Sequence, residues 1–300
     1  MLLKINNLEV RYGHQEKPAL SIERPVAFEE GERIGIIGSN GAGKTTLVKA
    51  LLGLVKYRGS ITTEIKPEEM AAHLQFNEYV NTMPVKHIME AILHTSIKKN
   101  QKLQELIEYF EFGPCLGKRY KALSGGQKQR FTIIMVMMQD APLTFYDEVT
   151  SGLDFETRQK LMEMLMKWYQ DKENTLCIVS HYYEELELLA DKLLILDQGK
   201  LVDYGDKREL FHKYCGKSII ITDNQEKNQK LLKDFPRLIS PEHLIAVPCS
   251  TMEDEQKVSE CLIRNNVNFK RSNNDIELMY INAKTRFNEA EGENSHEKKD

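Results

Sequence analysis

The chain has 300 residues, of which 41% are hydrophobic and 29% are charged, as in an ordinary globular protein with room for one large domain and an appendage or for two smaller domains. Its formal net charge is −4, whereas proteins that bind nucleic acid usually carry an excess of basic residues. We therefore expect no nucleic-acid partner, although the net charge does not exclude a local basic patch. No apolar run approaches the roughly 18 residues of a membrane-spanning helix, and we find no pattern of a secretory signal at the start. The five cysteines are scattered along the sequence, which indicates free thiols in a reducing compartment.

The N-terminal part of the chain begins with strand patterns and then turns to a helix. Apolar and polar residues alternate from Leu3 to Val10, as they do in half-buried strands. A short apolar strand over 33–37 ends in a glycine-rich turn, and residues 44–54 carry apolar side chains at helical spacing. This succession of strand, glycine-rich loop and helix is the context that a phosphate-binding loop requires.

Helix and strand patterns alternate in the middle of the chain. Residues 76–140 have mainly helical patterns, and they are followed by a strand over 143–146, a helix over 161–168 and strands over 175–179 and 193–196. Strands that alternate with helices predict an α/β fold with a parallel sheet.

The pattern changes after residue 215. Strands and two polar helices are expected there, which predicts a small α+β domain over 216–287. The expected strands cover 218–222, 244–247, 267–270 and 276–281. Residues 288–300 are polar and nearly free of apolar side chains, so we expect a disordered tail.

Residues 38–45 match the pattern GxxxxGK[ST] of a phosphate-binding loop. Glycines let the backbone curl so that successive N–H groups point at a phosphate, and the following helix adds its positive end. Lys44 would reach the β- and γ-phosphates of ATP, and the Thr45 hydroxyl would bind Mg²⁺. A plain glycine-rich turn is the alternative. The residues expected to bind ATP here are Gly38, Ser39, Asn40, Gly41, Ala42, Gly43, Lys44, Thr45 and Thr46.

Two adjacent carboxylates follow the hydrophobic strand at 143–146. Asp147 would hold Mg²⁺ through water, and Glu148 would act as the general base for the water that attacks the γ-phosphate. Taken alone, these residues could be a strand end with a solvated acidic turn. The phosphate loop upstream favours the catalytic interpretation.

A second anion-binding pattern, LSGGQ, lies at residues 123–127. Its serine hydroxyl, two glycines and free N–H groups at a helix start all suit a phosphate. Two chains related by a two-fold axis would enclose each ATP between the phosphate loop of one and the LSGGQ segment of the other. A serine-capped helix with flexible glycines is the alternative. The residues expected to bind the partner's ATP are Ser124, Gly125, Gly126 and Gln127.

Over residues 1–215 the chain resembles an ATP-binding-cassette (ABC) ATPase, because the phosphate loop, LSGGQ and the acidic pair occur in that order and Ser-Gly-Leu-Asp follows at 151–154. The resemblance implies a RecA-like P-loop NTPase core with an N-terminal antiparallel β-subdomain and a helical signature subdomain at about 76–140. In this family, ATP closes a dimer and hydrolysis reopens it, which moves membrane subunits between inward- and outward-facing states.

Four further residues match the family pattern one by one. The resemblance implies that Tyr12 stacks on adenine and that Gln75 senses Mg²⁺ and touches the coupling surface. It also implies that Asp154 reaches across the dimer to the other site and that His181 bonds the γ-phosphate. The alternatives are, in turn, an ordinary strand-end tyrosine, a loop amide, a helix N-terminal charge and a structural histidine.

One position departs from the family pattern. Val149 stands where proline is usual, and proline would fix φ at that turn. The valine could loosen the presentation of Asp154, yet we expect activity to survive. The catalytic residues that the resemblance implies are Glu148, His181 and Gln75, and the Mg²⁺ ligands are Thr45, Gln75 and Asp147.

The favoured function is the ATP-hydrolysing motor of a transporter on the cytoplasmic face of the cell membrane. The resemblance implies an integral membrane permease subunit, encoded separately, and a second copy of the chain or a paralogous ATPase. The segment 275–281 resembles the tail of ATPases that serve drug, antibiotic and peptide exporters, which favours export, although import stays open.

Other functions are weighed against this one. A single-cassette ABC ATPase without a transport role, such as an iron–sulfur assembly factor, stays open. A chromosome-maintenance member would need a long coiled coil, and a translation factor would need a second phosphate loop, and the sequence contains neither. A GTPase would need a guanine-reading [NT]-K-x-D segment, which is also missing.

Overall fold

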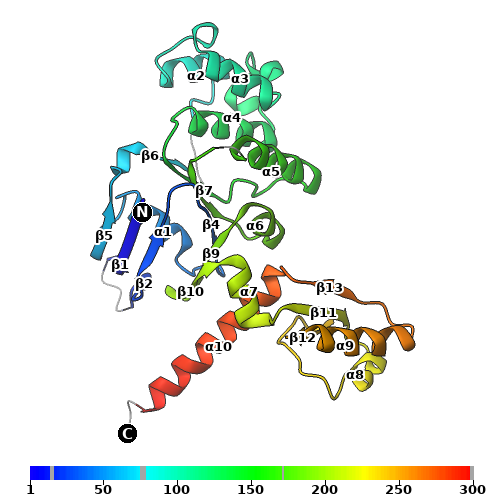
Figure 1. The fold of residues 1–300 in the computed structure, drawn as a ribbon. Coiled ribbons are helices and arrows are strands. Elements are labelled where there is room, and N and C mark those ends of the chain that lie inside the picture. The colour runs from blue at the N-terminus through cyan, green and yellow to red at the C-terminus, as the bar shows by residue number, and fades with distance from the viewer. Residues whose placement is uncertain (14–16, 75–78, 171, 298–300) are drawn as a thin grey trace.

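The computed structural model describes residues 1–13, 17–74, 79–170 and 172–297, and within these ranges ten strands form one large sheet (Figure 1). The strand order is β3-β1-β2-β10-β9-β4-β8-β7-β6, with β5 paired to β1 at the side. The strands are β1 (Leu3–Val10), β2 (Leu20–Ile22), β3 (Val26–Phe28), β4 (Arg33–Ile37), β5 (Arg58–Thr63), β6 (Met70–His73), β7 (Leu143–Asp147), β8 (Thr175–Val179), β9 (Lys192–Asp197) and β10 (Lys200–Asp206).

The central part of this sheet is parallel. β4 pairs with β8 and β9, and β7 pairs with β6 and β8, in each case parallel. β1 pairs antiparallel with β2, β3 and β5, so the N-terminal strands extend the sheet as an antiparallel region. β7 and β8 are buried along their whole length, as parallel strands covered on both faces must be. The predicted α/β class, with a parallel core and an antiparallel N-terminal part, is confirmed.

Helices cover the sheet and form a separate layer beyond it. Among the described residues, no helix is both long and apolar enough to cross a bilayer. The α-helices are α1 (Lys44–Leu51), α2 (Val85–Ile92), α3 (Gln101–Tyr109), α4 (Gly125–Met137), α5 (Phe155–Tyr169), α6 (Tyr183–Leu189), α7 (Lys207–Cys215), α8 (Glu226–Leu231), α9 (Met252–Arg264) and α10 (Ile276–Glu297).

The helices α2, α3 and α4 gather at one end of the molecule, drawn at the top of Figure 1. They occupy much of the segment in which helical patterns were expected. α4 is buried continuously from Phe131 to Met137 because other elements pack around it. The ring of Phe131 contacts those of Tyr79, Phe112 and Tyr120. This packing fixes the C-terminal part of α4 and leaves its N-terminal end, with the LSGGQ residues, accessible.

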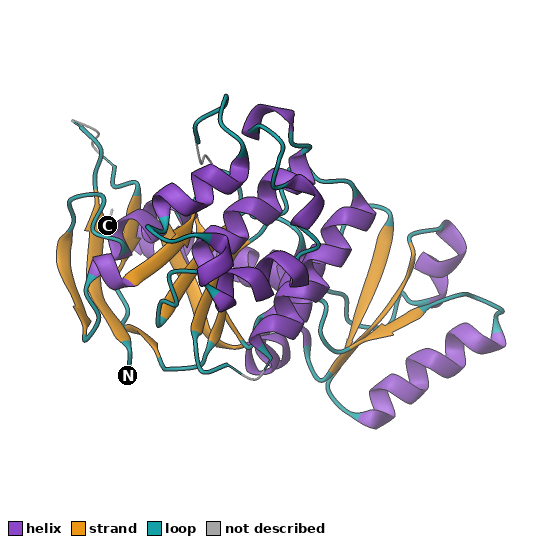
Figure 2. Ribbon diagram, turned by 90° about the horizontal axis from the view of Figure 1, so that it is seen from above, coloured by secondary structure: helices purple, strands orange, loops and turns teal. Residues whose placement is uncertain are grey.

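The segment after α7 forms a small sheet of its own. The strands β11 (Ser218–Asp223), β12 (Leu244–Cys249) and β13 (Lys270–Ser272) are antiparallel, with β11 in the middle. Buried apolar side chains of β11, β12 and α9 form a core that is separate from those of the large sheet. Figure 2 shows this small sheet on the other side of the helices from the large one.

Three expectations for the C-terminal segment differ from the structure. The strand expected over 276–281 is the start of α10, and that helix continues to Glu297, into the tail that was expected to be disordered. The strand expected over 267–270 begins only at Lys270. Ile276, Leu278 and Tyr280 are buried and alternate as in a strand, but Met279 and Ala283 are buried too, which is the spacing of a helix.

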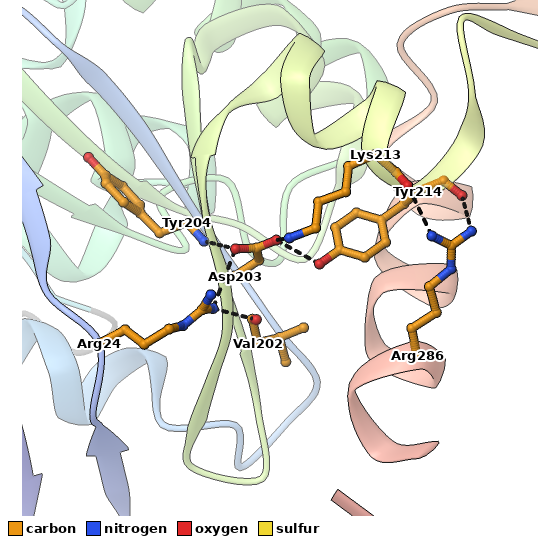
Figure 3. A network of polar contacts seen from close by, with 7 residues as sticks. All are labelled: Arg24, Val202, Asp203, Tyr204, Lys213, Tyr214 and Arg286. Carbon is orange, nitrogen blue, oxygen red and sulfur yellow. Dashed lines mark hydrogen bonds and ion pairs between the residues drawn. The ribbon is translucent and has the colours of Figure 1, made fainter. Parts of the chain in front are cut away.

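α10 returns from the small sheet to the large one. Along its path it packs against α7, α6 and β10. The guanidinium of Arg286 donates to the carbonyls of Lys213 and Tyr214, the two residues before the last residue of α7 (Figure 3). A cation at a helix C-terminus satisfies carbonyls that lack partners within the helix. The C-terminal segment is therefore joined to the large sheet and its helices both through α7 and through α10.

A buried carboxylate ties α7 to the large sheet. Asp203 of β10 accepts hydrogen bonds from Lys213 Nζ and the Tyr214 hydroxyl, each at 2.6 Å, and Arg24 Nη2 lies 3.4 Å away (Figure 3). Burial by itself would raise the pKa of Asp203, but the hydrogen bonds from Lys213 and Tyr214 outweigh it and the pKa is lowered.

Replacing Asp203 with Asn should lower the free energy of unfolding at neutral pH by about 1–3 kcal/mol, the usual contribution of hydrogen bonds to a charged group. Because the pKa of Asp203 is lower in the folded chain than in the unfolded one, its contribution is complete above the unfolded pKa of about 3.9 and is lost as the pH falls through the folded value. Urea unfolding at several pH values should show the difference between wild type and Asp203→Asn shrinking towards acid. The exposed Asp234→Asn change is the control, and a difference independent of pH would contradict the prediction.

Candidate nucleotide site

The phosphate loop joins β4 to α1 at the carboxyl end of the parallel strands. Gly43 has φ = +98° and precedes the first residue of α1. A Cβ on Gly38 would lie 2.5 Å from the Leu196 carbonyl oxygen, so a larger residue would force the loop away from β9. A cavity of about 400 Å³ opens above the loop, and it is lined by Ala19, Glu148 and residues 40–46. The expected ATP-binding residues Asn40 to Thr46 thus line one cavity, and Gly38 and Ser39 precede them in the loop without lining it.

Lys44 lies inside this loop. Its side chain is almost fully buried, and its ammonium donates to the carbonyls of Gly38 at 2.8 Å and Ser39 at 3.2 Å. Burial lowers the pKa of Lys44, and the charges of Glu148 and Asp147 oppose that shift. The lysine is therefore held at the wall of the cavity by two weakly charged oxygen atoms, which a phosphate could replace as a stronger partner.

Thr45 and Asp147 meet beside the same cavity. The Thr45 hydroxyl donates to Asp147 Oδ2 at 3.0 Å. The Asp147 side chain is 1% exposed, and its Oδ1 atom has no hydrogen-bond partner among the described residues. Burial raises the pKa of Asp147, although the hydrogen bond from Thr45 acts in the other direction. An unpartnered carboxylate oxygen next to a hydroxyl fits a hard cation such as Mg²⁺.

Glu148 and His181 are brought together from neighbouring parts of the sheet. Glu148 follows β7 and His181 follows β8, and Glu148 Oε1 lies 2.6 Å from His181 Nε2. Glu148 has a φ of +52°, an uncommon value for a residue with a side chain. Its backbone N–H donates to Val179 O at 2.9 Å, which holds this conformation. Such strain at a carboxylate facing a cavity is typical of a functional position.

The LSGGQ residues form a second cavity. Ser124 caps α4: its hydroxyl accepts from Gln127 N at 3.3 Å, and Gln127 Oε1 accepts from Ser124 N at 3.2 Å. Asp154 caps α5 by accepting from Thr157 N at 3.0 Å. Both helix ends line a cavity of about 410 Å³ that also includes Gly125 and Gly126. The serine cap that was the alternative interpretation is present, and so is a cavity that joins the LSGGQ segment to Asp154.

The two remaining sequence-predicted residues differ in how far the structure describes them. Tyr12 lies at the mouth of the phosphate loop, where its hydroxyl donates to Thr46 Oγ1 at 3.4 Å and its ring is partly exposed. Gln75 lies outside the described residues.

One polar residue near the site was missed by the sequence analysis. Glu185 of α6 is buried, and it accepts from Thr150 Oγ1 at 2.7 Å and from Ser180 Oγ at 2.6 Å. Burial raises the pKa of Glu185, and the two hydroxyl groups oppose that shift. Glu185 therefore joins the turn after Glu148 to the turn that carries His181. In the sequence it is one of two adjacent glutamates at a helix start, and only the fold shows which one is buried.

In the parallel sheet, the central strand β4 is followed by a glycine-rich loop and then by the helix α1. This arrangement defines a P-loop nucleotide-binding protein. The sequence profile of the family described as ABC transporter matches residues 25–151. A methionine import ATP-binding protein of Corynebacterium glutamicum is 32% identical over 72% of this chain and 67% of its own length. A linearmycin resistance ATP-binding protein of Bacillus subtilis is 29% identical over 73% of this chain and 74% of its own length.

The fold matches solved structures as well. A dimeric ATP-binding cassette in a post-hydrolysis state with ADP and Pi superimposes with a TM-score of 0.61, at 21% identity, over 68% of this chain and 98% of that one. The chain belongs to the ABC transporter family as an ATP-binding subunit with ATPase activity.

Replacing Lys44 with Ala should weaken ATP binding by about 10- to 100-fold, because a hydrogen bond to a charged group contributes about 1.5–3 kcal/mol. Isothermal titration calorimetry with ATP measures this directly. Lys49→Ala, in the last turn of the same helix, is the matched control and should bind as the wild type does. Unchanged affinity in the Lys44→Ala chain would contradict the assignment of this cavity to the phosphates.

Proposed function

We propose that this chain hydrolyses ATP as one half of a head-to-tail dimer and so drives a separate membrane subunit. The observation that supports this best is the division of the site into two cavities. One cavity is lined by the phosphate loop and Glu148, the other by the LSGGQ residues and Asp154, and no lining residue is shared. A two-fold axis would place the second cavity of each copy over the first cavity of the other.

Each residue at the composite site has a distinct role in the proposal. The N–H groups of residues 40–45 and Lys44 bind the phosphates, and Tyr12 stacks on the adenine. Thr45 and, through water, Asp147 hold Mg²⁺, with Gln75 as a further ligand, and the cation neutralises charge on the β- and γ-phosphates when it is bound. From the second copy, Ser124 to Gln127 bind the γ-phosphate and Asp154 supports the contact.

Glu148 and His181 carry the hydrolytic step. Glu148 accepts a proton from the water that attacks the γ-phosphate, and its left-handed backbone directs the carboxylate into the cavity. His181, 2.6 Å from that carboxylate, orients it and donates to the γ-phosphate when ATP is present. Through Ser180 and Thr150, Glu185 holds the turns that present these two side chains.

The membrane partner is inferred from the family of the chain, and the direction of transport is inferred from one short sequence resemblance. A separately encoded permease, with this chain on the cytoplasmic face of the membrane, fits the family of ATP-binding subunits. Export is favoured by the resemblance of segment 275–281 to the tails of exporter ATPases. Relatives named for import and for resistance match this chain about equally well. Transport assays with the permease would distinguish export from import. A chain that functions without any permease would instead support the iron–sulfur assembly type.

Replacing Glu148 with Gln should slow ATP hydrolysis by about 10²–10⁴-fold while ATP binding persists, since the general base is lost and the phosphate contacts remain. The variant should accumulate ATP-bound dimers, measured by light scattering. Glu184→Gln, on the exposed side of α6, is the control. A variant that stays monomeric under saturating ATP would contradict the head-to-tail dimer.

Mixing Ser124→Arg chains with Lys44→Ala chains should restore activity that neither variant has alone. In the mixed dimer, one composite site combines an intact phosphate loop with an intact LSGGQ segment, and the other site carries both defects. At equal concentrations, random pairing predicts recovery of about a quarter of the wild-type turnover. Turnover no higher than the sum of the separate variants would count against a site shared between copies.

A further inference from the structure

The C-terminal helix α10 contacts the outer side of the phosphate loop. The hydroxyl of Tyr280 accepts a hydrogen bond from the backbone N–H of Ser39 at 3.0 Å, across 241 positions of sequence. The carbonyl of Ser39 accepts from Lys44 Nζ at 3.2 Å on the inner side of the loop. The backbone of Ser39 is thus held from both sides, by Lys44 inside the loop and by Tyr280 of α10 outside it.

A second link joins α10 to the same loop residue through a buried acid. Asp197, at the end of β9, is 1% exposed. Its Oδ1 atom accepts from Ser39 Oγ at 3.3 Å and pairs with Lys284 Nζ at 3.2 Å. Its Oδ2 atom accepts from Asn288 Nδ2 at 3.5 Å. A buried carboxylate needs a cation close by, and here α10 supplies it.

The contacting residues of α10 form one row along the helix. Tyr280, Lys284 and Asn288 are spaced four residues apart, so they lie on the same face. The Tyr280 side chain is 6% exposed, and its ring lies against the ring of Tyr183 with 6.2 Å between the ring centroids. This face of α10 places a hydroxyl against Ser39 of the phosphate loop and an ammonium and an amide against Asp197, which itself accepts from Ser39.

α10 is held firmly enough to act as a support. Near its middle, Arg286 donates to carbonyls at the end of α7. At its start, Ile276 N donates to Glu187 Oε1 of α6 at 3.1 Å, and α6 is the helix that follows His181. α10 is therefore joined to α7 and to α6 as well as to the phosphate loop.

We propose that Tyr280 and Lys284 are positioning residues for ATP binding, and that they hold the phosphate loop at Ser39 in the conformation that receives the phosphates. The proposal rests on the proposed function. A glycine-rich loop loses much backbone freedom when it closes around a phosphate, and an external support reduces that loss before ATP arrives. The C-terminal segment thereby gains a role in the nucleotide site, because its return through α10 completes the support of the loop.

The first test removes one oxygen atom. Tyr280→Phe keeps the ring and deletes the acceptor for Ser39 N, so KM for ATP should rise by about three- to tenfold, which corresponds to the net contribution of one hydrogen bond. The value of kcat should change by less than about twofold, because binding of substrate and transition state weaken together. Tyr183→Phe, the other member of the same ring pair, is the control and should keep the wild-type KM.

The second test removes the cation. Lys284→Met keeps much of the side-chain length and leaves Asp197 without its ammonium partner, so KM for ATP should rise in the same direction. Lys257→Met, an exposed lysine on α9, is the matched control. The effects of Tyr280→Phe and Lys284→Met should be coupled in a double-mutant cycle, because both act through Ser39.

The outcomes separate this proposal from the proposed function. Wild-type KM in Tyr280→Phe and Lys284→Met, with ATP binding still weakened in Lys44→Ala, would overturn the role of α10 and leave the function standing. A lower melting temperature with an unchanged KM would show that the contacts only stabilise the fold, and it would overturn the proposal too. A wild-type chain that neither binds nor hydrolyses ATP would refute the proposed function and this proposal with it.

Discussion

The nucleotide site depends on the parallel register of β4, β8 and β7. Val179 of β8 is paired with Ile36 of β4 on one side and with Asp147 of β7 on the other. The three strands therefore end at the same edge of the sheet, and the residues that follow them meet there. Shifting one strand by a residue would turn its side chains to the other face and separate the acidic pair from the phosphate loop.

In the dimer that we propose, the edge of the sheet supplies one half of the ATP site and the LSGGQ segment of the second copy supplies the other half. The LSGGQ segment lies at the N-terminal end of α4, where the Ser124 hydroxyl accepts from Gln127 N and the Ser124 N–H donates to Gln127 Oε1. Because the hydroxyl only accepts in this cap, its O–H can still donate to a phosphate, and only the Ser124 N–H would have to exchange its bond with Gln127. The N–H groups of the first turn of α4 are also oriented outwards, so the cap is compatible with the anion binding that we propose.

The sequence predicted those parts of the site whose chemistry requires particular residues at short, fixed spacing. The phosphate loop and the Asp147–Glu148 pair are short, contiguous and placed at strand ends, so their surroundings could be inferred. The contact between Tyr280 and Ser39 spans 241 positions and leaves no local trace. In the same segment, the alternation of Ile276, Leu278 and Tyr280 imitated a strand, and the burial of Met279 and Ala283 distinguishes a helix. The helical conformation of this segment and its contact with Ser39 therefore depend on long-range packing, which the local sequence pattern does not show.

The turn after Glu148 shows how packing can replace a missing proline. Val149 is buried, and the next residue, Thr150, donates to the buried carboxylate of Glu185. Proline would restrict φ by its ring, whereas here a buried side chain and a hydrogen bond of 2.7 Å restrict the same turn from outside. Glu185 also accepts from Ser180, so one buried carboxylate joins this turn to the strand end that carries His181. With valine in place of proline, side-chain contacts and not a proline ring hold the turn next to the proposed general base.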